Sequence, residues 1–124
     1  LKEVRSFASL IHPGIVRYQS CWMESSDPDL KLCICDLSQW LRRNKSRDLR
    51  RAKIWFRQIV DGLSFLHRNN KIHRDMKPGN ILIEKYGNLK IGDLGNLTDG
   101  LNDEDDFHTA QTLYGTPMYM APEQ

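Results

Sequence analysis

Four polar side chains near the middle of the sequence could carry out one reaction together. Asp75 could accept a proton from a hydroxyl group, and Lys77 could neutralise a phosphoryl oxygen. Asn80 and Asp93 offer hard oxygen ligands of the kind that Mg²⁺ prefers. Phosphoryl transfer needs this set, because its catalysis consists mostly of positioning and charge stabilisation. The spacing therefore predicts a site suited to phosphoryl transfer.

Three motifs contain or follow these residues. Residues 73–80, HRDMKPGN, resemble the catalytic loop of protein kinases. Residues 92–95, GDLG, resemble the metal-binding DFG turn of that family, with Leu94 in place of Phe. Residues 115–123, GTPMYMAPE, resemble the end of the activation segment. The order of the three motifs and the short separations between them make the combination specific. The resemblance to protein kinases covers essentially the whole chain.

The resemblance implies a role for each polar residue. Asp75 would be the catalytic base, and Lys77 would contact the γ-phosphate of ATP. Asn80 and Asp93 would hold Mg²⁺ and so help to bind the nucleotide. A lysine two positions after the aspartate is similar to kinases that act on serine and threonine. His73 would order the loop by packing and hydrogen bonding rather than act as an acid or a base.

The N-terminal segment is predicted to be a helix over residues 1–10, because its apolar residues recur at helical spacing. Glu3 lies at the edge of the apolar stripe, where a solvated carboxylate is the simplest interpretation. The segment also resembles helix C of protein kinases, which implies that Glu3 pairs with a strand lysine that binds ATP. That lysine and the glycine-rich loop over the phosphates are expected upstream of residue 1.

The remaining segments predict an α+β fold. Strands are expected over residues 15–22 and 30–35, and residues 81–83 and 89–91 should form a hairpin that brings Asn80 near Asp93. The longest helix is predicted over residues 50–69, with His67 near its end and without a catalytic part. Its apolar stripe, expected in the core, consists of Ala52, Trp55, Phe56, Ile59, Leu63 and Leu66. The resemblance implies that residues 1–124 are part of a bilobal kinase domain, from the end of the small β lobe to the start of the helical lobe.

The predicted strand over residues 30–35 is followed almost directly by the next predicted helix. Asp36 can cap that helix, with Gln39 three residues later in a capping-box arrangement. In protein kinases several further residues separate these elements and contact the adenine ring. Either adenine is held differently in this chain, or the sequence carries a deletion.

Composition sets further limits. The chain has 124 residues, a net charge of +2 and 40% hydrophobic residues, which suits one globular unit but is too short for a whole kinase domain. We therefore expect a fragment that is inactive by itself. The balanced charge gives no reason to expect direct nucleic-acid contact. The basic residues between positions 42 and 53 are expected to form a solvated face. The alternative is that they form a docking patch for an anionic partner.

The sequence gives weaker signals for the compartment in which the protein is found. No apolar run approaches the ~20 residues that span a bilayer, although an anchor outside the chain is left open. Cys21, Cys33 and Cys35 lack the paired spacing of a zinc site. They are expected to be buried thiols of a reduced, cytoplasmic kinase domain.

Two stretches suggest a subgroup. Residues 12–18, HPGIVRY, and residues 21–24, CWME, resemble kinases that phosphorylate the alpha subunit of eukaryotic translation initiation factor 2. The expected partners are then ATP and that protein substrate, and the full-length protein could form a kinase dimer. A Wee1-like kinase is the alternative within the family. A pseudokinase that serves as a regulatory binding module is the alternative outside enzymes.

The residue before Asp75 predicts a switch. A guanidinium at Arg74 could bind a phosphate on the activation segment through two hydrogen bonds. Thr112 is the expected phosphate acceptor. Thr116 is the less favoured acceptor, because in the family its position more often supports the substrate and the catalytic loop. Phosphorylation at Thr112 would then order the segment and raise activity.

Overall fold

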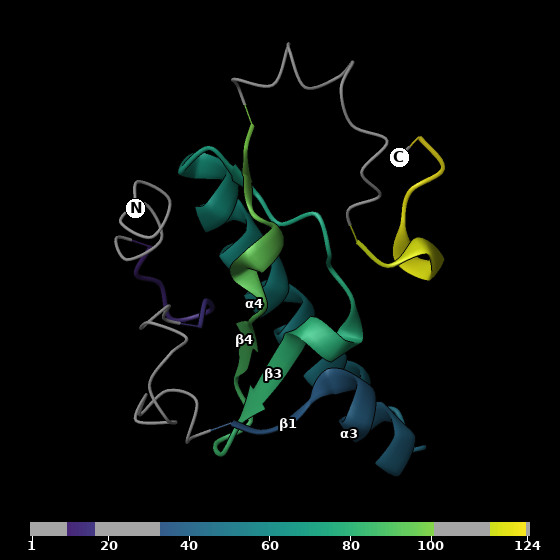
Figure 1. Ribbon diagram of the computed structural model, residues 1–124. Coiled ribbons are helices and arrows are strands. Elements are labelled where there is room, and N and C mark those ends of the chain that lie inside the picture. Colours follow the sequence, from purple (N-terminus) through teal and green to yellow (C-terminus); the bar gives the residue numbers. More distant parts are fainter. Residues whose placement is uncertain (1–9, 17–32, 101–114, 124) are drawn as a thin grey trace, which may run out of the picture.

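The computed structural model describes residues 10–16, 33–100 and 115–123, and it places two helices against a small antiparallel sheet (Figure 1). Strands β1 (Cys33–Asp36), β3 (Ile81–Glu84) and β4 (Leu89–Ile91) form the sheet in the order β1-β3-β4. Two further strands, β2 (Lys71–Ile72) and β5 (Thr98–Asp99), pair with each other. The predicted α+β class and the predicted hairpin, β3–β4, are confirmed.

Helix α3 (Leu37–Arg43) begins at the residue that follows β1, so the predicted tight join is confirmed. The capping box is present, because the Gln39 N–H donates to Asp36 Oδ1 at 2.8 Å and the Asp36 N–H donates to Gln39 Oε1 at 3.1 Å. Both hydrogen bonds satisfy backbone donors that a helix N-terminus otherwise leaves open. Local sequence alone therefore sets the start of α3.

Helix α4 (Leu49–Arg68) is the longest element, and Asp48 caps its N-terminus by accepting the Arg50 N–H at 2.9 Å. Its buried positions are Trp55, Gly62 and Leu66. These positions lie 7 and 4 residues apart, which is the spacing of one helix face. Gly62 lets this face approach β4 closely, since a Cβ there would lie 2.9 Å from Ile91 Cδ1.

Two residues of the predicted apolar stripe are not in the core. Phe56 is 67% exposed, because it is adjacent to Trp55 and so points about 100° away from the buried face. Ala52 is also exposed. The Trp55 indole donates to the Gly87 carbonyl in the β3–β4 turn at 2.8 Å, so residues that precede Trp55 extend beyond the end of the hairpin.

The hydrophobic core has two parts that meet at the β3–β4 hairpin. One part surrounds Ile91 of β4 and includes Ile15, and the other surrounds Trp55 and includes Ile83 of β3. Ile15 joins the sheet by a parallel bridge to Ile91, in which the Val16 N–H donates to the Ile91 carbonyl at 3.0 Å. This core holds the two ends of the hairpin in fixed positions relative to α4.

The other segments are short, and part of the predicted structure lies outside the described residues. The described residues include three 3₁₀ turns, η1 (Pro78–Asn80), η2 (Leu94–Asn96) and η4 (Pro117–Tyr119). The predicted N-terminal helix with Glu3, and most of the predicted strand at 15–22, fall outside the described ranges. In the part of the chain that is described, no helix combines the length and apolar character needed to cross a membrane.

Two neighbouring aromatic residues of α4 differ in burial, so their replacement by alanine should lower the free energy of unfolding by different amounts. Trp55→Ala should lower the free energy of unfolding by about 3–5 kcal/mol, because it removes a buried ring and leaves a cavity. Phe56→Ala should change it by less than about 0.5 kcal/mol, because that ring is exposed. Urea unfolding followed by far-UV circular dichroism would compare both variants with the parent. Equal losses would contradict the assigned face of α4.

Candidate active site

A buried histidine connects the two segments that carry the predicted site. His73 follows β2 and is only 1% exposed. Its Nδ1 accepts the Asp75 N–H at 3.2 Å, and its Nε2 lies 2.8 Å from the Gly92 carbonyl oxygen. Because Nδ1 accepts, Nε2 carries the proton and donates to Gly92. The ring therefore joins the 73–80 loop to the 92–95 turn, as the predicted ordering role requires.

The carboxylate of Asp75 lies at the centre of a hydrogen-bonded group. It is 8% exposed. Thr116 Oγ1 donates to Asp75 Oδ1 at 2.9 Å, and Asn80 Nδ2 lies 3.2 Å from Asp75 Oδ2. Lys77 Nζ lies 3.7 Å from the same Oδ2 atom. The structure thus brings together the three residues predicted as catalytic, and it adds Thr116.

These contacts determine the charge of Asp75. Burial raises the pKa of the carboxyl, but the hydrogen bond from Thr116, the positive charge of Lys77 and the hydrogen bond from Asn80 outweigh it. The pKa of Asp75 therefore lies below its ordinary value of 3.8. Asp75 is ionised at neutral pH and can accept a proton from a hydroxyl group.

Thr116 has a larger part than the sequence indicated. Its Oγ1 accepts a hydrogen bond from Lys77 Nζ at 2.6 Å while donating to Asp75. Gly115 precedes it with φ +97°, and a Cβ on Gly115 would lie 2.6 Å from the Arg74 carbonyl oxygen. Only glycine fits this close approach. The family resemblance implied that this position supports the catalytic loop, but it did not name Asp75 and Lys77 as the partners of Thr116.

Asn80 and Asp93 occupy the same end of the hairpin, as predicted. The Gly92 N–H donates to the Asn80 carbonyl at 2.8 Å. The Asn80 side-chain nitrogen also donates to the Asp75 carbonyl at 2.8 Å, so the amide oxygen is the end left for a cation. Asp93 is exposed and has φ +50°, a left-handed conformation that directs the chain into η2.

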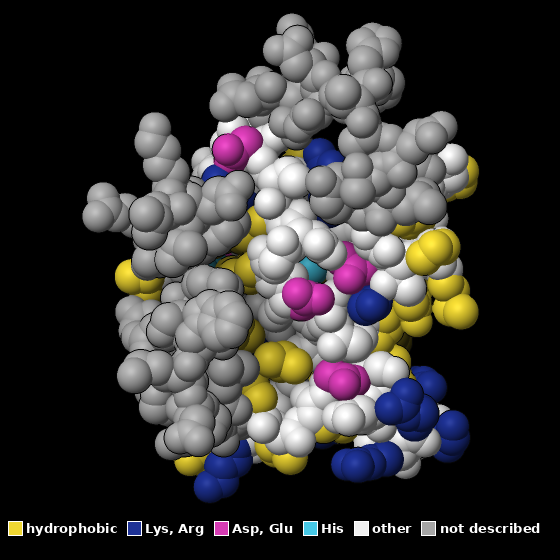
Figure 2. Space-filling view, in the orientation of Figure 1, with side chains coloured by type: hydrophobic (Ala, Val, Ile, Leu, Met, Phe, Trp, Pro, Cys, Tyr) yellow, Lys and Arg dark blue, Asp and Glu magenta, His cyan; other side chains and the backbone are white. Residues whose placement is uncertain are grey.

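The donor set fits Mg²⁺, which binds few protein oxygens and retains water and phosphate oxygens. Among residues 10–16, 33–100 and 115–123, no group of three or more His, Cys, Asp and Glu side chains could hold a metal ion alone. Asn80 and Asp93 would therefore supply only part of the coordination shell. On the face in Figure 2, acidic and basic side chains lie next to each other near the centre.

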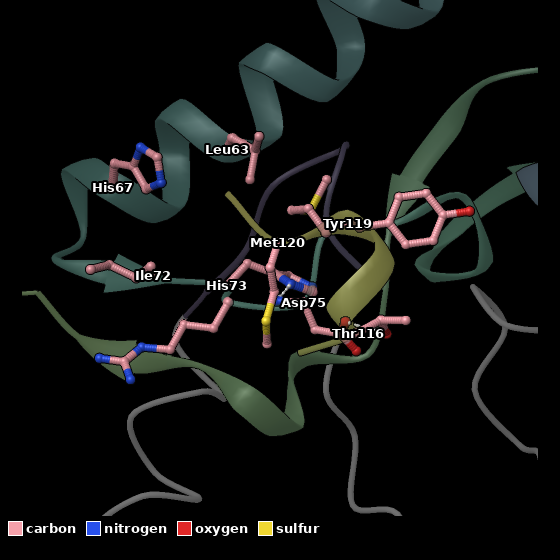
Figure 3. Close-up of a pocket in the computed structure, with 10 residues that line it drawn as sticks. Leu63, His67, Ile72, His73, Asp75, Thr116, Tyr119 and Met120 are labelled. Carbon is pink, nitrogen blue, oxygen red and sulfur yellow. Dashed lines mark hydrogen bonds between the residues drawn. The ribbon is translucent and has the colours of Figure 1, made fainter. Parts of the chain in front are cut away.

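A cavity of about 270 Å³ lies beside this group, and Figure 3 shows residues that line it. Asp75 and Thr116 lie on its polar side, while Leu63 of α4 and Met120 contribute apolar atoms. His67 lines the cavity from the last turn of α4, away from Asp75 in Figure 3. The cavity lining was not predicted, because it joins α4, the 73–80 loop and the segment after Thr116.

The predicted regulatory residues are only partly described. Arg74 is half-buried, has φ +67° and lines the cavity. Thr112 and Glu3 lie outside the described residues, so their expected roles stay predictions. Thr116 lies in the hydrogen-bonded group with Asp75, where its hydroxyl is already used by two partners.

The fold and this group of residues define the class of protein. The family model for the protein kinase domain matches residues 1–124, so the chain belongs to the protein kinase domain family. Its α+β structure is accordingly part of the bilobal kinase fold, as the resemblance implied.

Relatives come from several kinase groups. The chain is 36% identical over 148 residues to an interferon-induced, double-stranded RNA-activated protein kinase of Rattus norvegicus, with 99% of this chain and 28% of that protein covered. It is 39% identical over 130 residues to the probable serine/threonine-protein kinase WNK4 of Arabidopsis thaliana, covering 98% and 22%. It is 36% identical over 129 residues to serine/threonine-protein kinase Nek4 of Mus musculus, covering 98% and 16%. The chain thus spans between about a sixth and a quarter of these relatives, and they do not single out one subgroup.

The Asp75–Thr116 hydrogen bond predicts that Thr116→Val lowers the free energy of unfolding by an amount that depends on pH. Ionised Asp75 accepts this bond, so the variant should lower the free energy of unfolding by about 1–3 kcal/mol near neutral pH. A carboxyl whose pKa is lowered by folding contributes stability above its unfolded pKa and loses it as pH falls through the folded pKa. The cost should therefore shrink below pH 3.8, the ordinary value.

Urea unfolding between about pH 6 and pH 3 would measure this cost. The matched control is the same substitution in an Asp75→Asn background, where the cost should no longer depend on pH. A cost of Thr116→Val that stays constant across this range in the parent background would contradict the assigned contact.

Proposed function

We propose that the full-length protein is a serine/threonine protein kinase that transfers the γ-phosphoryl group of ATP to a protein hydroxyl. The observation that carries the proposal is the ionised, oriented carboxylate of Asp75, held between Thr116 and Asn80 with Lys77 3.7 Å away. A base and a cation at this separation suit a reaction in which a hydroxyl loses a proton while a phosphoryl oxygen is neutralised.

Each side chain would contribute one function to the transfer. The substrate hydroxyl gives its proton to Asp75 and its oxygen forms a new bond to the γ-phosphorus. The bond between the γ-phosphorus and the oxygen that bridges it to the β-phosphate breaks, and ADP leaves with that oxygen. Lys77 neutralises charge on the transferred group. Asn80 and Asp93 would hold Mg²⁺, which supplies electrostatic stabilisation of the phosphates when bound. Thr116 holds Asp75 and Lys77 in position relative to each other through its two hydrogen bonds.

For the substrate, we propose the alpha subunit of translation initiation factor 2. Support comes from the resemblance of residues 12–18 and 21–24 to kinases of that subunit. The double-stranded RNA-activated kinases of rat and mouse are also among the relatives. A Wee1-like kinase is the competing assignment.

One observation favours a second candidate, a regulatory binding module without catalysis. Strand β1 ends at Asp36 and α3 begins at Leu37, so the residues that contact adenine in protein kinases have no counterpart between them. The Asp36 N–H also donates to Gln39 and is not available to a nucleotide base. A chain that binds no nucleotide would fit this second candidate.

Two substitutions should separate catalysis from nucleotide binding. In the full-length protein, Asp75→Asn should lower the single-turnover phosphorylation rate by about 10²–10⁴-fold while most of the ATP affinity remains. Asp93→Ala should instead weaken Mg²⁺-dependent ATP binding, because a metal ligand is lost. Rapid-quench assays and calorimetric ATP titrations would measure both effects. An unchanged rate in Asp75→Asn would refute the assigned base.

The direct join between β1 and α3 predicts weak selection of the nucleotide base. A site that does not hydrogen-bond the base discriminates poorly, so the affinities for ATP and GTP should agree within about tenfold. Competition binding with both nucleotides would test this. Asp93→Ala serves as the control, since it should weaken both nucleotides equally. A preference for ATP of a thousandfold or more would mean that other residues recognise adenine.

A further inference from the structure

A second cavity, of about 640 Å³, shares no lining residue with the cavity beside Asp75. It is formed where β1, the end of α3, the first turns of α4 and the β3–β4 turn meet. Asn80 and Gly92 flank the opposite end of the same hairpin, so the hairpin separates the cavity from Asp75 and its partners. We call this cavity the hairpin groove.

Hydrogen bonds between α4 and the β3–β4 turn fix the shape of the hairpin groove. Trp55 Nε1 donates to the Gly87 carbonyl at 2.8 Å. The Gln58 side chain donates to Asn88 Oδ1 at 2.9 Å and accepts the Leu89 N–H at 2.9 Å. A ligand would therefore meet a preformed surface, which lowers the entropic cost of binding.

The groove carries an excess of positive charge. Arg43, Arg50, Arg51 and Lys85 line it. Its two acidic residues are already engaged within the chain. Asp48 caps α4 through the Arg50 N–H, and Glu84 lies 3.4 Å from Lys90 Nζ. Basic side chains also gather over α3 in Figure 2, at the lower right of the view.

Exposed apolar side chains lie among these charges. Ile34 is 66% exposed, Ile54 is 57% exposed and Tyr86 is 81% exposed, and all three line the groove. An isolated exposed apolar residue needs no explanation, but several that line one basic cavity mark a surface for binding. The combination would accept an apolar side chain flanked by carboxylates.

We propose that the hairpin groove binds an acidic linear segment of a partner protein, with an apolar residue of that segment placed against Ile34 and Ile54. Charge complementarity identifies the partner as acidic, and the exposed apolar side chains next to the basic ones favour a peptide that carries an apolar residue. This inference does not depend on phosphoryl transfer, since no residue of the groove belongs to the group around Asp75.

The aromatic geometry favours a peptide over single-stranded RNA. Binding of single-stranded RNA uses open aromatic faces on which bases stack. Trp40 packs edge-on against Trp55 with ring centroids 4.8 Å apart, and the Arg51 guanidinium lies 5.7 Å from the centroid of each ring. These faces are therefore occupied within the chain. Tyr86 is the aromatic ring of the lining that is strongly exposed.

Fluorescence anisotropy of the full-length protein would test the proposal. The probe is a short labelled peptide of glutamates around a central leucine. It should bind, and its affinity should fall with added salt. The double variant Arg43→Glu/Arg50→Glu should weaken binding at least about tenfold, because it reverses two charges of the groove. Arg57→Glu, on α4 but outside the groove lining, should change it less than about twofold.

A second pair of variants tests the apolar contact. Ile54→Ser should weaken peptide binding several-fold. Phe56→Ser should not, because Phe56 is an even more exposed residue of α4 that lies outside the lining. Tyr86 lies in an exposed turn, so Tyr86→Ala is a groove variant that leaves the core intact. Far-UV circular dichroism would verify folding of each variant.

Three results would overturn the proposal. They are absence of peptide binding by the parent protein, equal weakening by the groove and control variants, and binding of labelled oligouridine in preference to the peptide. A peptide in which serine replaces the leucine should bind more weakly, and equal affinity of the two peptides would refute the apolar contact. Loss of kinase activity in Asp75→Asn with unchanged peptide binding would show that the groove acts independently of the active site.

Discussion

The predicted active site depends on one buried imidazole. His73 accepts the Asp75 N–H and donates to the Gly92 carbonyl, so its ring joins the 73–80 loop to the 92–95 turn, next to the bond from the Gly92 N–H to the Asn80 carbonyl. A ring whose Nδ1 accepts a hydrogen bond carries its proton on Nε2, which is the atom that faces the Gly92 carbonyl. Loss of either bond would leave a buried polar group without a partner, which is costly. Together with the Asn80 hydrogen bonds to Asp75 and the β3–β4 pairing, these bonds hold Asp75, Asn80 and Asp93 close to each other.

A second constraint comes from a part of the chain about forty residues away. Thr116 links Asp75 to Lys77 through its hydroxyl, and the ammonium and the carboxylate also form an ion pair at 3.7 Å. The 3.7 Å separation leaves the lysine able to meet a further anion. Gly115 permits this arrangement by letting the backbone approach Arg74. The charge state of the base and the position of residues 115–123 are therefore coupled.

Local features were predictable from the sequence, and tertiary contacts were not. The Asp36–Gln39 capping box and the hairpin around Gly87 follow from spacing over a few residues, and both were predicted. Phe56 was wrongly placed in the core, because periodicity gives a stripe but not its width. The resemblance implied that Thr116 supports the catalytic loop, and a docking patch was an alternative for the basic residues, but the particular partners of Thr116 and the lining of the hairpin groove were not predicted, since each joins segments that are distant in sequence. The family resemblance indicated which polar residues matter, but not how they are held.

The direct join between β1 and α3 has consequences at both ends of the sheet. Because α3 begins at Leu37, its first turn stays beside the strand, and Trp40 reaches the ring of Trp55. Arg51 then covers both rings, and the basic end of α3 comes to lie next to the β3–β4 turn. A longer connection would let α3 move away from the sheet and open this contact. The join that leaves no residue between β1 and α3 is thus the same feature that brings the lining of the hairpin groove together.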